Sequence, residues 1–381
     1  MLTILTVLII LSMAYWIVAW WNVRTFFRRP PASMFHYMPP VSILKPARGL
    51  DAGLYENFAS FCRQDYPEYE ILFGVLDPDD PAIAIIRQIQ RDFPEHPIRL
   101  VVARPIGFNN KVSILHALAA EARYPIFVLS DSDMRVAPDY LRRVVSPLAD
   151  QKIGLITCLP RGVQAESFGA IMEALELGAG FLPAAMLGLQ MLKMAYAFGA
   201  SITLWREDLE RIGGFAAIAD YLADDYQVAA RIARLGRRVL LSDYLMDNVL
   251  GAMPLREVWH RHVRWFRCAR VSRPYEYLTV IITFTLPLAL LILLGTGFAR
   301  SGWALLVSTI LLRYVVTWLI SGYTHDQVVR QHLLWVPLHD LLHLGYWAAG
   351  LVGRRVVWKD EVFEVERDGR LETWRAGILR S

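Results

Sequence analysis

The sequence predicts an α/β domain with a mainly parallel sheet, flanked by transmembrane helices at both ends of the chain. Between residues 41 and 255, short β-branched runs alternate with amphipathic helical stretches, the pattern of layered α/β proteins. Apolar stretches of membrane-spanning length lie before and after this region. The 381 residues are 55% hydrophobic and have a mean hydropathy of +0.32. This is more apolar material than the core of a soluble enzyme of this length needs.

The first apolar run, residues 2–21, carries no charge and has about the ~20 residues that a helix needs to cross hydrocarbon. Arg24, Arg28 and Arg29 follow it, and no basic residue precedes it. This order predicts an uncleaved anchor over residues 1–23, with the arginines on the cytoplasmic side. We therefore expect an integral membrane protein in which the region after Pro30 begins in the cytoplasm. A compact chain without a targeting extension would fit a bacterial inner membrane.

Strands and helices are expected to alternate within a catalytic domain over residues 41–255. In a parallel sheet, ligands bind beyond the carboxyl ends of the strands, so polar residues at those ends are the candidates for chemistry. Helices are expected over 81–93 and 111–123. The expected strands cover residues 41–45, 69–76, 98–103, 126–130, 153–157 and 201–205.

The C-terminal membrane region is expected over residues 278–353. Residues 278–298 and 303–323 predict two spans, whereas 333–352 contains ionisable residues that are costly at membrane depth, so it either spans or lies in the interface. The positive-inside rule favours a third segment that does not cross, because residues 354–381 then form a basic cytoplasmic tail.

A further apolar run within the α/β region, residues 181–205, contains Lys193 as its one charge. If it crossed the membrane, the carboxylates before and after it would face opposite sides. The alternatives are a half-inserted helix pair followed by a strand and an ordinary buried helix.

Composition also excludes some classes of function. Forty basic residues stand against 36 acidic ones, so no phosphate-binding surface for nucleic acid is indicated. The three cysteines have neither the spacing of a disulfide framework nor that of a metal site.

Aspartates follow two of the expected strands. Asp77 comes after the second, where a carboxylate can accept hydrogen bonds from a base or ribose. Asp131 and Asp133 come directly after the run 126–130, one residue apart. Two carboxylates placed this way can bind Mg²⁺ or Mn²⁺ and leave coordination positions for phosphate oxygens.

A second acidic pair, Asp224 and Asp225, opens an expected helix. Negative groups stabilise a helix N-terminus, which accounts for one of the two. The other is then available as a general base for an acceptor hydroxyl.

A basic aromatic helix is expected over residues 256–273, at the membrane interface. Arg261 and Arg264 are three residues apart and so lie on one face, with Trp265 beside them. Paired guanidinium groups can hold a diphosphate, whereas a positive-inside belt with an interfacial tryptophan is the alternative.

Taken in order, these motifs resemble lipid-acting glycosyltransferases with a GT-A fold, above all the ceramide glucosyltransferase family, glycosyltransferase family 21. The short runs at residues 41–46, 65–67, 79–82 and 213–214 are similar as well. The positions that match the family's three aspartates and its Gln/Arg-x-x-Arg-Trp box are Asp77, Asp131, Asp225, Arg261, Arg264 and Trp265.

The resemblance implies inverting transfer of glucose from a UDP-sugar to a membrane lipid, giving a β-glycolipid. It implies that Lys45, Asp77 and Lys111 hold the uridine end and that Asp131 and Asp133 bind the divalent metal. It further implies that Asp225 is the base and that the arginine box closes over the diphosphate. The implied partners are thus a UDP-sugar, a lipid acceptor and the membrane.

Two departures leave the acceptor open. Animal ceramide enzymes have a histidine after a glycine where this chain has Gly178, Ala179, Gly180 and Phe181, and a glycine at the position of Asp133. Bacterial relatives that add N-acetylglucosamine to a bacteriohopane polyol are similarly close, so hopanoid biosynthesis is the alternative.

Two other functions fit less well. A processive polysaccharide synthase shares the aspartates and the arginine box but needs more spanning helices to form a polymer channel. A non-catalytic scaffold that only binds nucleotide needs neither the base Asp225 nor the Arg261 box.

Overall fold

The structure is a computed structural model that describes residues 2–29, 37–358 and 361–373. The chain divides into two compact units, which we call the helical unit and the sheet unit. The helical unit comprises Met1–Arg29, Gly162–Leu192 and Leu250–Asp368, and the sheet unit comprises Pro30–Arg161, Lys193–Val249 and Gly369–Ser381. The segment Gly162–Leu192 therefore leaves the α/β region and packs with the apolar helices.

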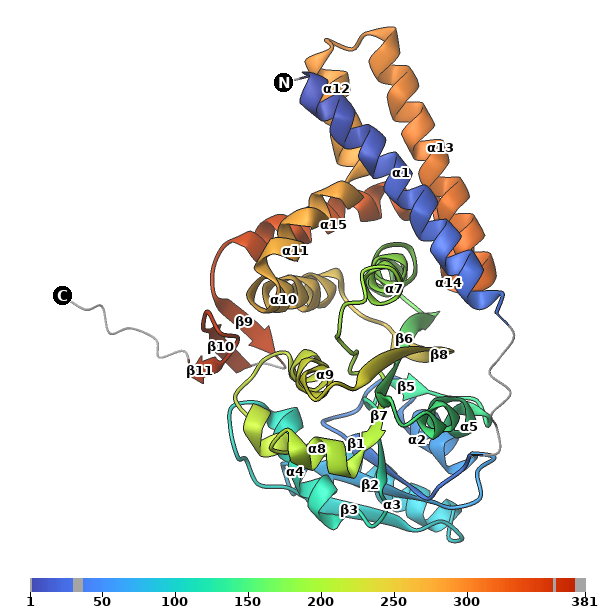
Figure 1. The fold of residues 1–381 in the computed structure, drawn as a ribbon, viewed down its shortest axis with the longest axis vertical. Helices are drawn as coiled ribbons and strands as arrows, with labels where there is room; N and C mark the ends of the chain where they lie inside the picture. The colour runs from blue at the N-terminus through green and yellow to red at the C-terminus, as the bar shows by residue number, and fades with distance from the viewer. Residues whose placement is uncertain (1, 30–36, 359–360, 374–381) are drawn as a thin grey trace, which may run out of the picture. The chain divides into compact units, whose positions relative to one another are not determined.

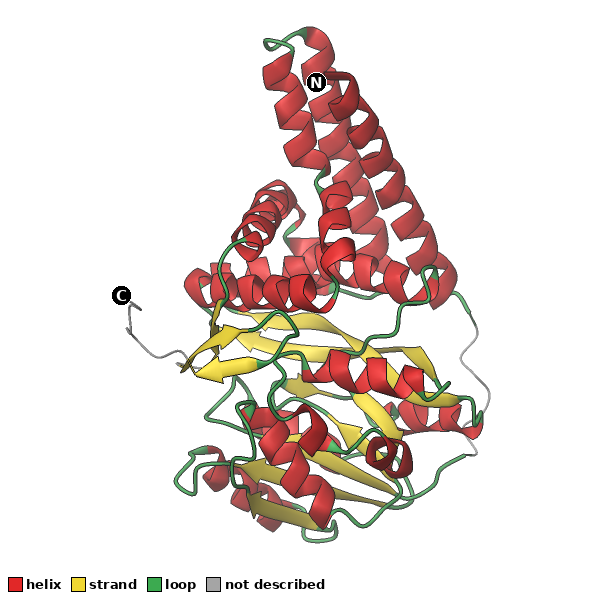
Figure 2. Ribbon diagram, turned by 60° about the vertical axis from the view of Figure 1, so that its left-hand side comes forward, coloured by secondary structure: helices red, strands yellow, loops and turns green. Residues whose placement is uncertain are grey.

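The sheet unit is built on a mixed sheet, whose strands are yellow in Figure 2. Its strand order is β3-β2-β1-β4-β7-β6-β8-β5. The strands β1 to β4 are parallel, and β7 pairs antiparallel with both β4 and β6. The bounds are β1 (Val41–Pro46), β2 (Tyr69–Val75), β3 (Ile98–Val102), β4 (Ile126–Leu129), β5 (Met134–Arg135), β6 (Ile153–Ala165), β7 (Ile202–Trp205) and β8 (Arg238–Gly251).

Alternation of side chains along the central strands gives this sheet two buried faces. On β1, Ile43 contributes to one apolar cluster and Leu44 to the other. Helices α2, α3 and α5 cover the first face and α4 and α9 the second, the layered arrangement that the sequence predicts. The helices of this unit are α2 (Leu54–Cys62), α3 (Ala82–Asp92), α4 (Asn110–Glu121), α5 (Tyr140–Val145), η1 (Ser146–Ala149), α8 (Arg206–Arg211), η3 (Phe215–Ile218) and α9 (Asp224–Arg234), and β11 (Leu371–Thr373) belongs to the same unit.

The six predicted strands are all present, with two differences. The run 153–157 opens a longer strand, since β6 continues to Ala165, and the long strand β8 was not predicted. The helices predicted over 81–93 and 111–123 are α3 and α4.

In the helical unit, α1 (Leu2–Phe27) packs along α12 (Thr285–Gly295) and α13 (Arg300–Tyr323) (Figure 1). Ile9 of α1 lies in an apolar cluster with residues of both partners, and the Ser12 and Thr285 hydroxyls are 2.6 Å apart. The remaining elements are α6 (Phe168–Leu175), η2 (Glu176–Phe181), α7 (Leu182–Gln190), α10 (Leu255–Ser272), α11 (Pro274–Thr279), η4 (Val280–Thr283), α14 (Gln327–Gln331), η5 (Leu333–Trp335), α15 (Val336–Leu351) and the strands β9 (Arg355–Trp358) and β10 (Glu361–Val365).

Among the described residues, three helices are long and apolar enough to cross a membrane: Leu2–Phe27, Phe168–Gln190 and Arg300–Tyr323. The first of the two predicted C-terminal spans, 278–298, lies on a bent helix pair, because Pro274–Thr283 and Thr285–Gly295 are bent by 63° at the break between them. Counted as one bent span, this pair gives a fourth. The ionisable residues in 333–352 lie on α15, which is not among these candidates within the described chain.

Candidate active site

Asp131 lies just after the carboxyl end of β4 and forms an ion pair with a lysine of α4. The Lys111 ammonium, on α4, lies 2.6 Å from Asp131 Oδ1 and 3.7 Å from Asp224 Oδ2. Burial opposes the charge of Lys111, but the two carboxylates outweigh it and hold the pKa of this lysine above its ordinary value. The structure thus joins a predicted donor-binding lysine to both acidic motifs.

Lys45, at the end of β1, is fully buried beneath the same turn. Its Nζ donates to the Asp131 carbonyl at 2.8 Å and lies 3.7 Å from the centre of the Phe61 ring. Burial lowers the pKa of Lys45 to about 7, although Asp131 and Asp133 favour its charged form. In this position Lys45 supports the Asp131 turn, and its contact with a uridine stays a prediction.

The turn Asp131-Ser132-Asp133 has a partner that sequence reasoning missed. The Ser132 hydroxyl donates a hydrogen bond to the Asp51 carboxylate, which lies in the loop after β1. Asp133 is close enough to Lys45 to favour the ammonium form. No motif marked Asp51, because its only relation to the acidic turn is contact in the folded chain.

Asp225 lies in the first turn of α9, after the N-cap residue Ala223. Its Oδ2 accepts a hydrogen bond from the Gly199 amide at 3.2 Å, and its Oδ1 accepts from the Tyr226 amide at 2.7 Å. Burial, followed by the neighbouring carboxylate of Asp224, raises the pKa of Asp225 to about 7. A carboxylate that titrates near neutral pH is suited to accept a proton during a reaction.

Gly199, in the loop before β7, joins the two acidic motifs. A Cβ at this position would lie 2.8 Å from Lys111 Nζ and 3.0 Å from Asp131 Oδ2. The loop backbone therefore approaches the ion pair as closely as a glycine allows.

Asp77 follows β2 at the same edge of the sheet, but the structure gives it no contact with the Asp131 cluster among the described residues. It is exposed, and its Oδ1 accepts a hydrogen bond from the Asp79 amide at 2.9 Å. The strand β1 lies between β2 and β4. The common edge is as predicted, and an approach of Asp77 to a nucleotide stays a prediction.

Arg261, Arg264 and Trp265 lie on α10, in the helical unit. Arg261 is engaged by a buried carboxylate of the same unit, with Nη1 3.2 Å from Glu173 Oε1. The Trp265 ring packs edge-on against the ring of His262. The expected helix is therefore present, and the role of this box toward a diphosphate is not tested by the geometry of its own unit.

Comparison with known proteins identifies a family and several relatives of this chain. A model of Glycosyl transferase family 21 matches residues 4–371. The chain is 26% identical over 240 residues to Ceramide glucosyltransferase 1 of Caenorhabditis elegans, covering 62% of this chain and 51% of that protein. It is 23% identical over 346 residues to Ceramide glucosyltransferase 3 of the same organism, covering 88% and 74% respectively. The first match thus spans about half the length of the relative.

Among solved structures, a mannosyltransferase from Pyrobaculum calidifontis superposes with a TM-score of 0.55 at 18% sequence identity. The match covers 92% of this chain and 97% of that one. At this identity the likeness concerns the fold, which is of the GT-A type as the sequence predicts.

Proposed function

Because the chain belongs to glycosyltransferase family 21, we propose that it transfers glucose from a UDP-sugar to a membrane lipid such as ceramide, with inversion at the anomeric carbon. The single observation that carries the proposal is the cluster of Asp131, Lys111 and Asp225 at the carboxyl edge of the parallel strands. The similarity of the chain to ceramide glucosyltransferases supports the choice of donor and acceptor.

In this proposal Asp225 is the general base. The acceptor hydroxyl oxygen forms a bond to the anomeric carbon while its proton passes to the Asp225 carboxylate, and the bond between that carbon and the diphosphate oxygen breaks. The Gly199 amide orients the base through Oδ2, leaving the other oxygen's remaining lone pair for the proton. Attack from the face opposite the leaving group gives a β-glycoside from an α-linked donor.

The residues at the Asp131 turn fit a divalent cation. Asp131 and Asp133 supply carboxylate oxygens, the donors that Mg²⁺ and Mn²⁺ prefer, and two such ligands leave positions for phosphate oxygens. The Lys111 ammonium lies 2.6 Å from Asp131 and 3.7 Å from Asp224, and the carboxylates of Asp133 and Asp225 bring further negative charge to this edge. When bound, the cation would offset charge on the leaving diphosphate. The similar mannosyltransferase was solved with GDP-Man and Mn²⁺.

Lys111 then keeps the carboxylates of the two motifs in a fixed relation, and Lys45 fixes the backbone of the turn from below. Asp77 is proposed to hold the uridine. Arg261, Arg264 and Trp265 are proposed to hold the diphosphate, a role that follows from the family resemblance.

The experiment that tests the proposal separates binding from transfer. Asp225→Asn is expected to bind UDP-glucose within about threefold of the wild type, measured by calorimetry, and to lose at least ~100-fold in transfer, the range of general-base contributions. Asp139→Asn, at an exposed carboxylate before α5, is the matched control and should keep full activity. Transfer by Asp225→Asn at the wild-type rate would refute the assigned base.

A second acceptor is favoured by one observation. The animal ceramide enzymes have a histidine after a glycine where this chain has Gly178, Ala179, Gly180 and Phe181, and these residues lie on η2 in the helical unit. N-acetylglucosamine transfer to a bacteriohopane polyol is therefore the alternative. Mass spectrometry of total lipids from cells with and without the gene distinguishes them: a missing hexosylceramide supports ceramide, and a missing aminosugar hopanoid supports the alternative.

A further inference from the structure

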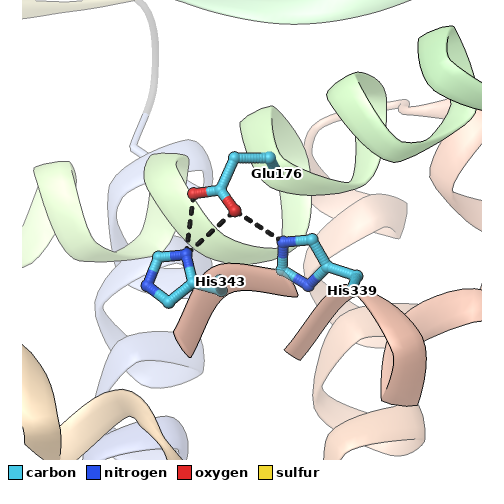
Figure 3. A group of neighbouring side chains, drawn as sticks. All are labelled: Glu176, His339 and His343. Atoms are coloured by element: carbon cyan, nitrogen blue, oxygen red, sulfur yellow. Dashed lines mark hydrogen bonds and ion pairs between the residues drawn. The ribbon is translucent and has the colours of Figure 1, made fainter. Parts of the chain in front are cut away.

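Two histidines of α15 converge on one buried carboxylate within the helical unit (Figure 3). His339 Nε2 lies 2.8 Å from Glu176 Oε2, and His343 Nδ1 lies 2.9 Å from both oxygens of the same carboxylate. The histidines are one helical turn apart, so both rings point to the same side of α15. Glu176 and His339 are buried and His343 is largely so.

The backbone around Glu176 is unusual. Glu176 opens η2, a π-helical stretch between α6 and α7, and such stretches are rare and often occur at functional sites. A Cβ at Gly180, one turn further on, would lie 3.2 Å from Glu176 Oε1 and 3.3 Å from His339 Cε1. A larger residue at position 180 would therefore crowd the Glu176 carboxylate and the His339 ring.

Both ring nitrogens of His339 lie beside carboxylates. Its Nε2 faces Glu176, while its Nδ1 lies 3.2 Å from Asp340 Oδ1, so both ring nitrogens face carboxylate oxygens. A neutral imidazole carries one N–H and can satisfy only one of them, whereas an imidazolium carries two and satisfies both. If a cation is bound at Nε2, the Nδ1 proton can be donated to Asp340, and this carboxylate–histidine–metal arrangement is the common way to orient a ligating histidine.

Asp340 is itself fixed. Arg313, from α13, donates to both of its oxygens, from Nε at 2.8 Å and from Nη2 at 2.7 Å. A bidentate pair of this kind sets the direction of the carboxylate. Arg313 therefore fixes Asp340, and Asp340 in turn fixes the Nδ1 side of the His339 ring.

We propose that Glu176, His339 and His343 bind a zinc ion in the helical unit, separate from the cation proposed at Asp131. Their ligand atoms lie within 4.8 Å of one another, and tetrahedral zinc places its ligands ~3.3 Å apart, so small shifts of the side chains complete the site. Two imidazoles and one carboxylate suit zinc better than Mg²⁺, which prefers oxygen ligands. Three protein ligands leave a fourth position for water or for an oxygen of a bound molecule.

The test is the zinc content of the full-length protein purified in detergent, measured by inductively coupled plasma mass spectrometry. About one zinc per chain is expected in the wild type, and less than a tenth of that in His339→Ala and His343→Ala. His116→Ala, at an exposed histidine of α4, is the matched control and should keep its zinc. Asp131→Ala should also keep it, which separates this site from the catalytic one.

Two results would overturn the proposal. One is a wild-type protein that holds less than a tenth of an equivalent after incubation with zinc chloride and desalting. The other is zinc that stays in His339→Ala and His343→Ala but leaves in Asp131→Ala.

A second measurement keeps the proposal testable if the alanine variants fail to fold. Wild-type protein reconstituted with Co²⁺ should show the visible absorption bands of a cobalt ion with nitrogen and oxygen ligands, and Asp131→Ala should show the same bands. Asp340→Asn keeps all three ligands and should weaken cobalt binding by about 10-fold to 100-fold, the usual effect of removing an outer partner. Wild-type protein without the bands would contradict the site.

Discussion

The raised pKa of Asp225 predicts how the rate of transfer depends on pH. A general base works in its deprotonated form, so activity is lost as the pH falls through the pKa of the base. With a pKa of about 7, roughly 9% of Asp225 is deprotonated at pH 6 and roughly 91% at pH 8. We therefore expect kcat/KM to rise about tenfold between these values, whereas an aspartate with an ordinary pKa of ~3.9 would give no change.

The neighbouring carboxylate provides the perturbation. After burial, Asp224 is the largest cause of the raised pKa of Asp225, since a negative charge beside a carboxylate disfavours its ionisation. Asp224→Asn removes that charge, so the pKa of Asp225 should fall. The acid limb of the profile then moves to lower pH, and the tenfold ratio between pH 8 and pH 6 falls toward one.

The assay is turnover of radiolabelled UDP-glucose from pH 5.5 to 9 at low substrate concentration, with the acceptor that the lipid analysis identifies. Asp139→Asn removes an exposed carboxylate and should leave the profile unchanged. A wild-type profile that is flat between pH 6 and pH 8 would refute the reasoning. So would an acid limb that Asp224→Asn leaves in place.

Two further predictions concern packing. Glu70 is buried and accepts hydrogen bonds from the Ser42 hydroxyl, the Arg99 guanidinium and the Arg123 amide, so Glu70→Ala should lower the free energy of unfolding by about 3 kcal/mol, as breaking buried ionic contacts does. Thermal denaturation measures this, and an unchanged melting temperature would contradict it. Gly199→Ala should lower transfer at least tenfold at a nearly constant melting temperature, because its methyl group meets the Lys111 ion pair. Gly322→Ala, where a methyl group meets nothing within 4 Å, should stay active, and equal activity of the two variants would argue against a crowded site.

The strands β1, β2 and β4 were predictable because each is a short, mainly apolar run buried on both faces. The strand β8 gave a weaker signal. Asp243 and Asp247 interrupt its apolar residues, since it pairs antiparallel with β5 and several of its positions are half-exposed. Such a strand has no continuous apolar run, and its existence depends on a partner that is distant in sequence.

The bend in the span expected over 278–298 has a local cause that the hydropathy pattern does not show. Pro287 lacks an N–H and cannot donate to the Thr283 carbonyl, so a continuous helix loses a hydrogen bond there. In the structure the Thr283 carbonyl accepts a hydrogen bond from the Trp16 indole instead, at 3.3 Å. Composition predicted the apolar length of the segment, and the proline explains the bend between its two helices.

For the candidate active site, the sequence likewise predicted the residues but not their contacts. Strand ends and acidic pairs predicted Asp131 and Asp225, because carboxylates at the edge of a parallel sheet are open to ligands. The sequence could not predict that Lys111 links the two motifs or that Asp224 shapes the pKa of its neighbour. Both effects arise from distances that exist only after α4 and α9 pack on the same face of the sheet.

The same reasoning explains why ionisable residues are tolerated among the apolar helices. From the sequence, Asp340 and the two histidines of α15 argued against a simple span, because an isolated charge in hydrocarbon is costly. In the fold, Arg313 and Glu176 supply partners from α13 and η2, so those charges face protein groups. Burying such groups gives less stability than an apolar core of equal volume would. The zinc ion proposed above would give the fold a reason to keep these groups in place of an apolar core.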